Sequence, residues 1–198
     1  MKVYTANINS DFSCLYEWVK SEAEKFKNPK RQKEYIAGRF LVIKALKDWG
    51  INGDIVFKYA ENGKLYVDDA PCFNISHDGD IAICACSEFD VGADVVKIDR
   101  FSEKIPAKMF TGEEQKILGD NTVKIALLWS LKEAHSKMKG EGIAKTSKLM
   151  DFSGLIADDT FPQNVLYNGA YFYSVKQEEY VITVCSEKPV KPEFIFVI

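Results

Sequence analysis

An aspartate stands inside an otherwise apolar stretch, VGADVV at 91–96, which predicts a buried strand. An ionised carboxylate in such a strand needs a cation, hydrogen-bond donors or a metal ion, because burying the charge alone is unfavourable. Asp94 is therefore a candidate ligand for a metal ion or a cationic side chain. The other interpretation is a carboxylate that accepts hydrogen bonds from backbone amides at a strand end.

A predicted helix at 123–139 places an acid and a base side by side. Its apolar side chains recur at steps of four, three and four, which predicts a buried stripe made of Leu127, Leu131, Ala134 and Met138. Glu133 and Lys137 lie on the adjacent stripe and, being four residues apart, point the same way. They form either a solvent-facing pair worth about 0.3–0.5 kcal/mol or a site edge. At such an edge Glu133 binds a hard cation and Lys137 binds phosphate oxygens.

The chain has two histidines, and their settings are predicted to differ. His77 follows Ser76 in a polar stretch at 73–80, just before an apolar run, and this pattern predicts a turn. The pair is either an ordinary strand-ending turn or a phosphate contact, with the Ser76 hydroxyl as a donor and His77 as a donor or a positive charge. His135 is turned about 200° from Glu133 around the helix axis, which predicts a surface position and no ligand role.

Basic side chains gather on a second predicted helix, at 31–49, and beside a predicted hairpin. The helix carries, on its non-core sides, Arg31, Lys33, Arg39, Lys44 and Lys47. Lys64 follows the Asn-Gly turn of the hairpin. A solvated basic face is the ordinary explanation for both groups. The alternative is a binding site for a polyanionic small molecule, since arginine and lysine pair readily with phosphate.

The remaining elements are predicted from the spacing of apolar residues and from capping and turn residues. A first helix follows a capping Ser10-Asp11, with apolar residues recurring at three- and four-residue steps up to Phe26. The Asn-Gly turn predicts a hairpin between 55–59 and 64–67 in which both central residues have positive φ. The later elements alternate between strands and helices: strands at 81–86 and 91–96, helices at 103–118 and 122–139, and strands at 171–176, 180–185 and 193–198.

This order predicts an α+β fold of two similar halves, 1–97 and 98–198. The 198 residues carry 26 basic and 29 acidic side chains, a net charge of −3, and 46% are hydrophobic. Such a balance disfavours a disordered tail, a collagen-like fibre and a disulfide-stapled mini-domain, and it argues against a dedicated nucleic-acid binder. The longest uncharged run, 160–175, is too short and too polar to span a bilayer.

The cysteines and the amino terminus predict a cytoplasmic protein. The first residues lack the apolar block of a signal peptide. Five cysteines, an odd number, are typical of reduced thiols in a chain without export signals. Cys84 and Cys86 alternate within an apolar run, so we interpret them as small buried hydrophobes and not as half of a zinc site.

Four segments together resemble a known family, the 4′-phosphopantetheinyl transferases. They are FNISH at 73–77, VGAD at 91–94, WSLKEAHSK at 129–137 and GEG at 140–142. The length and two-half layout resemble the monomeric, surfactin-synthetase-activating type more than the short trimeric holo-acyl-carrier-protein synthases. The similarity runs from about residue 31 to residue 142. It implies an α+β fold in which two similar α/β halves form a pseudo-dimer.

The resemblance also implies a reaction and a metal site. In this family, a serine of an apo acyl, peptidyl or aryl carrier protein attacks the β-phosphate of coenzyme A. The phosphopantetheine arm moves to the serine, and 3′,5′-adenosine bisphosphate leaves. Matched position by position, Asp94 and Glu133 would hold Mg²⁺, with Mn²⁺ as the alternative ion. The implied partners are the carrier protein and coenzyme A, with no nucleic acid and no membrane, and the implied state is a monomer.

The remaining site residues are implied in the same way. The catalytic set is Glu133, Lys137 and His77, with Glu133 as the candidate base that takes the serine proton, directly or through a metal-bound water. The coenzyme A contacts are Arg39, Lys64, Ser76, His77 and Lys137. Arg39 resembles an arginine of the family's early basic helix. Lys64 corresponds to the lysine of the family's G-K-P element, in which Leu65 here replaces the proline.

One position departs from the family pattern. The usual motif is G-x-D-x-E, and this chain has Val96 where the second acid stands. Water can replace the lost ligand, because Mg²⁺ keeps several waters in proteins. The alternative is a catalytically weakened or inactive homologue that binds coenzyme A or a carrier protein without turnover.

Overall fold

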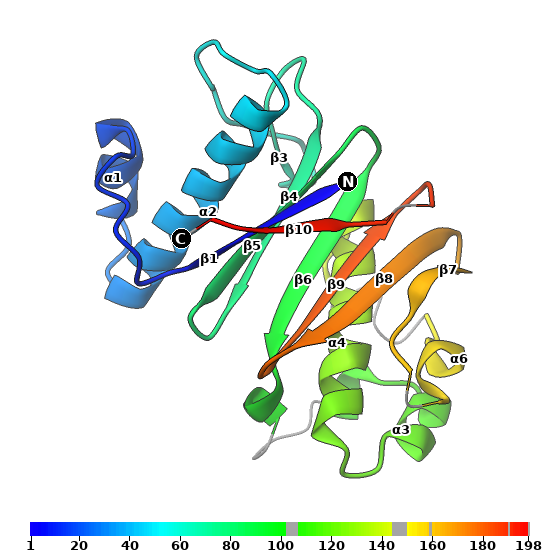
Figure 1. Cartoon of the computed structure of the whole chain (residues 1–198). Coiled ribbons are helices and arrows are strands. Elements are labelled where there is room, and N and C mark those ends of the chain that lie inside the picture. Colours follow the sequence, from blue (N-terminus) through cyan, green and yellow to red (C-terminus); the bar gives the residue numbers. More distant parts are fainter. Residues whose placement is uncertain (102–106, 144–149, 159, 190, 198) are drawn as a thin grey trace.

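Two four-stranded sheets dominate the computed structural model, which describes residues 1–101, 107–143, 150–158, 160–189 and 191–197 (Figure 1). The first sheet has the order β10-β1-β5-β4 and contains β1 (Lys2–Asn7), β4 (Cys72–Asp78), β5 (Ile81–Ser87) and β10 (Glu193–Phe196). The second has the order β6-β9-β8-β7 and contains β6 (Val91–Lys97), β7 (Gln163–Tyr167), β8 (Ala170–Gln177) and β9 (Tyr180–Ser186). β10 pairs parallel with β1, and the other pairings in these sheets are antiparallel.

The helices and a short hairpin surround these sheets. The helices are α1 (Glu17–Ala23), α2 (Pro29–Asp48), α3 (Gly112–Leu118), α4 (Thr122–Lys139) and α6 (Ser153–Ile156). The hairpin consists of β2 (Lys58–Tyr59) and β3 (Leu65–Tyr66). Within the described ranges, no helix is both long and apolar enough to cross a membrane. The mixture of sheets and helices is an α+β fold, as the sequence predicts.

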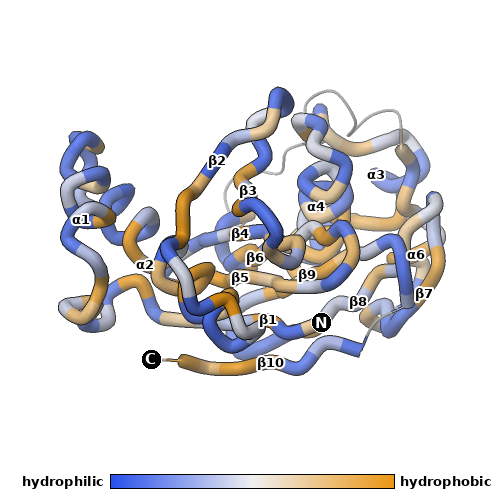
Figure 2. Tube along the Cα trace, turned by 90° about the horizontal axis from the view of Figure 1, so that it is seen from above, coloured by the Kyte–Doolittle hydropathy of each residue, from blue (hydrophilic) through white to orange (hydrophobic). Residues whose placement is uncertain are grey.

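The elements form four layers, in the order helix, sheet, sheet, helix. One core lies between α2 and the first sheet, where Leu41 and Leu46 pack with Ala82 and Cys84. A second core lies between the two sheets and joins side chains of β1, β5, β6 and β9. A third lies between α4 and the outer face of the second sheet. Seen from above, α2 lies on the side of α1, and α4 lies on the side of α3 and α6 (Figure 2).

Local signals in the sequence set the ends of the two long helices. The Asn28 side chain caps α2 by accepting from the backbone amide of Lys30, and Pro29 occupies the first turn. The Asn121 side chain accepts from two amides at the start of α4. Gly140 ends α4 in the left-handed region, with φ at 67°. These ends fix where the side chains of both helices meet the strands.

Gly92 allows α4 to lie directly against β6. A Cβ atom built at this position would come within 2.6 Å of the Met138 amide nitrogen and closer still to the carbonyl oxygen of Ala134. Both atoms belong to the backbone of α4, so no side-chain rotation relieves the contact. The absence of a side chain at Gly92 therefore sets the distance between the strand that carries Asp94 and the helix that carries Glu133.

The two sheets meet along β4 and β6, which are edge strands of different sheets. Side chains of β4 bond to the backbone of β6: Asn74 Oδ1 accepts from the Ala93 amide at 3.0 Å, and Asp78 Oδ2 accepts from the Lys97 amide at 2.8 Å. Because side chains span this junction, the strands stand apart and the polar groups between them face a common space. Ser76, between the two anchoring residues, faces that space.

Much of the predicted secondary structure is confirmed. The basic helix, the helix with the Glu-Lys pair, the strands on either side of residue 90 and the three late strands are all present as α2, α4, β5, β6, β8, β9 and β10. The predicted start of a helix at 103 lies outside the described residues, and α3 begins at Gly112. Cys84 and Cys86 are buried, as predicted. The stripe of Leu127, Leu131, Ala134 and Met138 is buried as well.

Three local predictions are wrong. The polar stretch around His77 is strand β4 and not a turn. The first helix begins at Glu17, and residues 11–16 before it include a short turn and no helix. In the hairpin, only Gly63 of the Asn-Gly pair has positive φ, and the Gly63 amide donates to the carbonyl of Ala60. This geometry is a turn followed by a left-handed glycine and not the predicted two-residue turn.

The boundary between the predicted halves stays a prediction. β6 lies before residue 97 in the chain but pairs with β9 in the second sheet. β10 comes last in the chain but pairs with β1 in the first sheet. The sheets therefore exchange strands across the predicted division.

Candidate active site

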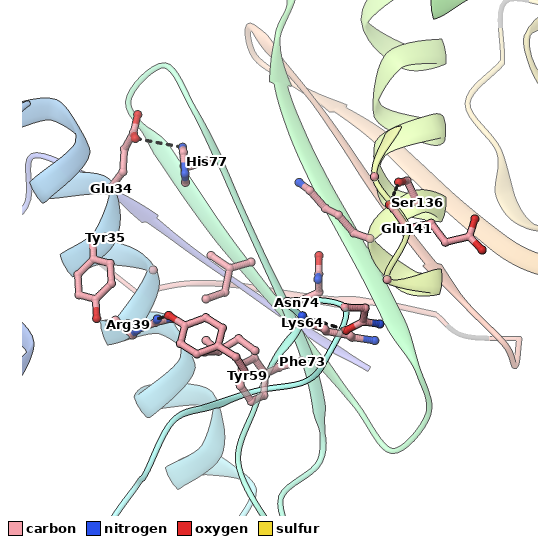
Figure 3. A pocket seen from close by; sticks show the side chains of 18 of the residues that line it. Glu34, Tyr35, Arg39, Tyr59, Lys64, Phe73, Asn74, His77, Ser136 and Glu141 are labelled. Atoms are coloured by element: carbon pink, nitrogen blue, oxygen red, sulfur yellow. Dashed lines mark hydrogen bonds and ion pairs between the residues drawn. The ribbon is translucent and has the colours of Figure 1, made fainter. Parts of the chain in front are cut away.

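A cavity of about 500 Å³ opens between α2, the hairpin, β4 and the C-terminal end of α4 (Figure 3). Basic side chains reach it from each of these elements, namely Arg31, Arg39, Lys64, His77 and Lys137. The residues after α4, 140–142, close one end. A large, open and largely basic pocket of this kind suits a polyanionic ligand.

A second cavity of about 280 Å³ shares a wall with the first. Its lining includes Ser76, His77, Asp94, Glu133 and Lys137. His77 and Lys137 also line the larger cavity, so they stand where the two spaces meet. The smaller cavity thus holds the two predicted metal ligands, and the larger one holds the predicted coenzyme A contacts Arg39 and Lys64.

Asp94 is the most buried of these acids, with 4% of its surface exposed. Its Oδ1 atom accepts from Lys137 Nζ at 2.6 Å and from Ser76 Oγ at 2.7 Å. Lys137 Nζ also donates to Ser76 Oγ at 2.8 Å, which closes a three-membered network. Asp94 Oδ2 is buried and has no hydrogen-bond partner within the described residues. A buried carboxylate oxygen without a donor is a suitable ligand for a cation.

Glu133 faces the same cavity from α4. Burial raises the pKa of its carboxyl group above the usual range, and the nearby Asp94 carboxylate raises it further, while Lys137 and Arg100 act in the opposite direction. Two carboxylates in one small cavity repel each other, and a divalent cation between them removes that repulsion. The two acids supply hard oxygen ligands, which fit Mg²⁺ or Mn²⁺.

Lys137 pairs with Asp94 across the two elements, so the solvent-facing Glu133–Lys137 pair is not the arrangement that forms. Val96 lies two residues after Asp94, on the same face of β6, and is fully buried in the core beneath α4. No group of three or more His, Cys, Asp or Glu side chains arranged for a metal occurs in the part of the chain that the structure describes. The candidate metal ligands in this cavity are therefore the two acids Asp94 and Glu133.

His77 lies between two charged residues of α2. Arg31 Nη1 is 2.6 Å from Nε2 of the ring, and Glu34 Oε2 is 3.5 Å from Nδ1. Burial lowers the pKa of His77, and the positive charges of Arg31 and Lys137 act in the same direction, whereas Glu34 raises it. Neither Arg31 nor Glu34 was among the predicted contacts of this histidine.

The other two predicted coenzyme A contacts are held by protein groups. The Arg39 guanidinium lies over the rings of Tyr35 and Phe57, 4.7 and 4.6 Å from their centroids, and donates to the Tyr59 hydroxyl at 3.0 Å. Lys64 Nζ donates to Asp90 at 2.8 Å and to the Met138 carbonyl at 3.3 Å, so it joins the hairpin to the end of α4. Both cations remain part of the wall of the larger cavity.

The second histidine is not at the surface, and that prediction is wrong. His135 is 4% exposed and packs between the rings of Phe152 and Phe172. Ser130, one turn before Glu133 on α4, is fully buried too and shares a hydrogen bond of 2.6 Å with Thr183. The cause in both cases is that α4 is covered on more than one side, by the second sheet and by the segment around α6.

Sequence comparisons find similarity to known proteins. Residues 90–185 match the family described as the 4′-phosphopantetheinyl transferase superfamily, a range that includes Asp94, Glu133 and Lys137. The chain is 30% identical over 157 residues to a 4′-phosphopantetheinyl transferase of Bacillus subtilis, which is 73% of this chain and 69% of that protein. It is 29% identical over 153 residues to the transferase psf-1 of Bacillus pumilus, 71% of this chain and 64% of that protein.

A third relative matches over a shorter stretch. The transferase Sfp of Bacillus subtilis strain 168 is 35% identical over 98 residues, 46% of this chain and 44% of Sfp. The chain thus spans less than two thirds of the Bacillus pumilus and strain 168 relatives.

Proposed function

Because the chain belongs to the 4′-phosphopantetheinyl transferase superfamily, we propose that it transfers the phosphopantetheine arm of coenzyme A to a serine of an apo carrier protein. The serine oxygen forms a bond to the β-phosphorus, the bond from that phosphorus to the bridging oxygen breaks, and 3′,5′-adenosine bisphosphate leaves. The acceptor class is an acyl, peptidyl or aryl carrier protein.

One observation carries the proposal: Asp94, Ser76 and Lys137 form a single network that opens into the cavity containing Glu133. Phosphoryl transfer needs positioning and charge neutralisation more than covalent chemistry from the protein. The network supplies both, because it fixes a cationic amine where the two cavities meet and a carboxylate in the wall of the smaller one. The larger cavity then accommodates the nucleotide part of coenzyme A beside Arg39 and Lys64.

We propose that Asp94 and Glu133 hold Mg²⁺, or Mn²⁺, on the grounds that Asp94 Oδ2 is a buried oxygen with no partner in the described ranges. The ion supplies charge neutralisation for the diphosphate. Lys137 binds a phosphate oxygen, since its amine already stands at the cavity wall. Ser76 and His77 bind the diphosphate as donors. Glu133 accepts the proton of the attacking serine, because it faces the cavity where the two substrates meet.

A second candidate function rests on Val96. Val96 stands where the family's G-x-D-x-E motif has its second acid, so the metal site has one ligand fewer. A homologue that binds coenzyme A or a carrier protein without turnover therefore has a specific basis in this chain. The Asp94 network favours activity, because Lys137, Ser76 and Asp94 remain in contact although Val96 replaces an acid. The predicted cytoplasmic location and monomeric state stay predictions.

The test is a transfer assay with a panel of purified apo carrier proteins, coenzyme A and either Mg²⁺ or Mn²⁺. We expect mass spectrometry to show the addition of one phosphopantetheine arm to at least one carrier. Coenzyme A binding without transfer, and transfer after Val96→Glu, would favour the second function. Neither binding nor transfer with any carrier and metal would contradict both.

We also propose that the two helix-and-sheet units are the related halves of a pseudo-dimer. In that arrangement α2 on the first sheet corresponds to α4 on the second. The predicted division between 1–97 and 98–198 then holds for the helices, while β6 and β10 each cross it to join the other half's sheet. The support is that each unit has one long helix on the outer face of one four-stranded sheet. The active site then lies where the two halves meet, along β4 and β6.

A further inference from the structure

An acidic side chain stands in the wall of the basic pocket. Glu34 lines the larger cavity together with Arg31, Lys64 and Lys137, and only 12% of its side chain is exposed. A carboxylate in a pocket for a diphosphate repels the ligand, because two negative charges approach in a partly buried space. Glu34 pairs with Arg31 of its own helix at 3.4 Å, and its second contact inside the pocket, with His77, indicates a further task.

Glu34 faces one ring nitrogen of His77, and Arg31 faces the other. Glu34 Oε2 lies 3.5 Å from Nδ1, while Arg31 Nη1 lies 2.6 Å from Nε2 (Figure 3 draws the Glu34 contact). A guanidinium has donors and no acceptor. Nε2 therefore accepts in this contact, and the ring proton sits on Nδ1, directed toward the Glu34 carboxylate.

We propose that Glu34 is a positioning residue that holds His77 in this tautomer and orientation, so that Nε2 faces the diphosphate of coenzyme A. The inference rests on the proposed function, since that function places the diphosphate beside His77. A carboxylate behind one imidazole nitrogen fixes the ring and stabilises its protonated form. When a phosphate draws Arg31 away from Nε2, that nitrogen becomes free to take a proton and donate to a phosphate oxygen.

The charges around His77 agree with this division of tasks. Arg31 and Lys137 make a proton on the ring less favourable, whereas Glu34 and Asp78 make it more favourable. Arg31 and Glu34 come from α2, Asp78 from the same strand as His77, and Lys137 from α4. An anionic ligand that occupies Arg31 and Lys137 removes much of the opposition and leaves the Glu34 contribution in place.

The proposal predicts a change in coenzyme A affinity opposite to the one expected from charge repulsion alone. If Glu34 were only a negative charge in the pocket, Glu34→Gln would strengthen coenzyme A binding. Because Glu34 positions His77 through a charged contact at 3.5 Å, we expect Glu34→Gln to weaken binding about tenfold, which is at the low end of the effects of losing a partner of a charged group. Binding is measured by calorimetry with Mg²⁺ and coenzyme A, with no carrier protein present.

A double-mutant cycle tests whether Glu34 acts through His77. In a His77→Ala background, we expect Glu34→Gln to change the dissociation constant by less than about twofold. Glu141→Gln is the matched control, because it removes a carboxylate that lines the same pocket on the side opposite His77 (Figure 3). That control should not weaken binding. An equal loss from Glu34→Gln with and without His77, or tighter binding in Glu34→Gln, would overturn the proposal.

Nitrogen-15 NMR of the imidazole rings gives a readout that needs no ligand. The chain has two histidines, so the His77→Ala spectrum identifies the His77 signals. We expect the neutral His77 ring to carry its proton on Nδ1 in the unmodified protein and to mix the two tautomers in Glu34→Gln. A proton fixed on Nε2 would refute the proposal. Absence of coenzyme A binding in the unmodified protein, with the Nδ1 tautomer present, would instead contradict the proposed function.

Discussion

Gly92 sets the distance between β6 and α4 at the candidate active site, and Gly92→Ala is predicted to disturb both folding and the proposed transfer reaction. The added Cβ atom would lie 2.6 Å from the Met138 amide nitrogen and 2.9 Å from the carbonyl carbon of Ala134. Ordinary van der Waals contact begins at 3.4 Å, so bringing the first distance from 2.6 to 3.4 Å requires α4 to move by 0.8 Å. The carbonyl oxygen of Ala134 lies nearer and demands a larger shift.

This displacement separates Glu133 and Lys137 on α4 from Asp94 on β6. Overpacking of this kind lowers the free energy of unfolding by about 1–3 kcal/mol, which for a chain of this length lowers Tm by about 2–4 °C per kcal/mol. A misplacement of about 1 Å in a catalytic group can reduce the rate about 100-fold. We therefore expect Gly92→Ala to lose about two orders of magnitude in kcat/KM while it remains folded at 25 °C.

The assay is carrier-protein modification followed by mass spectrometry, run beside thermal unfolding of the same samples. Gly53→Ala is the control, because a Cβ atom there meets nothing within 4 Å and the backbone has no positive φ. It should leave both Tm and rate unchanged. If Gly92→Ala kept the Tm and the rate of the unmodified protein, the argument that this glycine sets the position of α4 would be refuted.

Three further predictions concern buried charge, acid stability and metal binding. Lys132→Met breaks a fully buried ion pair with Glu114, in which the charged atoms are 2.9 Å apart. Urea denaturation should show a free energy of unfolding lower by about 3–5 kcal/mol. A change under about 1 kcal/mol would contradict this prediction. Burial lowers the pKa of His135, so the unfolded chain, whose histidine titrates near 6.5, takes up the proton first as the pH falls. The stability that this neutral histidine contributes above pH 6.5 is therefore lost as the pH falls toward its lower pKa in the folded protein. Denaturation curves between pH 7 and 5 should show a smaller loss of stability in His135→Phe. The loss that remains in that variant includes the part due to His77. An unchanged slope would count against it. Asp94→Asn should abolish the rise in Tm that Mg²⁺ gives in the presence of coenzyme A, and a rise equal to that of the unmodified protein would exclude Asp94 as a ligand.

The long amphipathic helices and the apolar strands could be predicted from the sequence, because their patterns are local. β4 could not, since Asn74, Ser76 and Asp78 are polar for reasons outside the strand. They bond to the backbone of β6 or to Asp94. Polar side chains that form hydrogen bonds between two sheets interrupt the apolar pattern of a strand, so the sequence of this strand resembles that of a turn.

The candidate site was predictable only in part. Motif spacing predicts Asp94, Glu133 and Lys137 as site residues, a role that stays a prediction, and the structure brings Lys137 and Asp94 into contact with Ser76. The contact between Glu34 and His77 joins residues 43 positions apart, and no local pattern indicates it. The spacing of Arg31 and Glu34, three residues apart, indicates only that these two side chains pair on α2, and it does not indicate that both contact His77. The burial of His135 depends on how many elements cover α4, which helical periodicity alone does not report.

The pairing of β10 with β1 links residue 2 to residue 193. During synthesis on the ribosome, β1 emerges before the other strands of both sheets, yet its parallel neighbour β10 is made after all of them. Until then β1 presents unsatisfied amide and carbonyl groups on one side, a surface to which other nascent chains can add. A gene shortened before codon 193 should therefore yield a product that aggregates, even though every residue around the two cavities would still be translated.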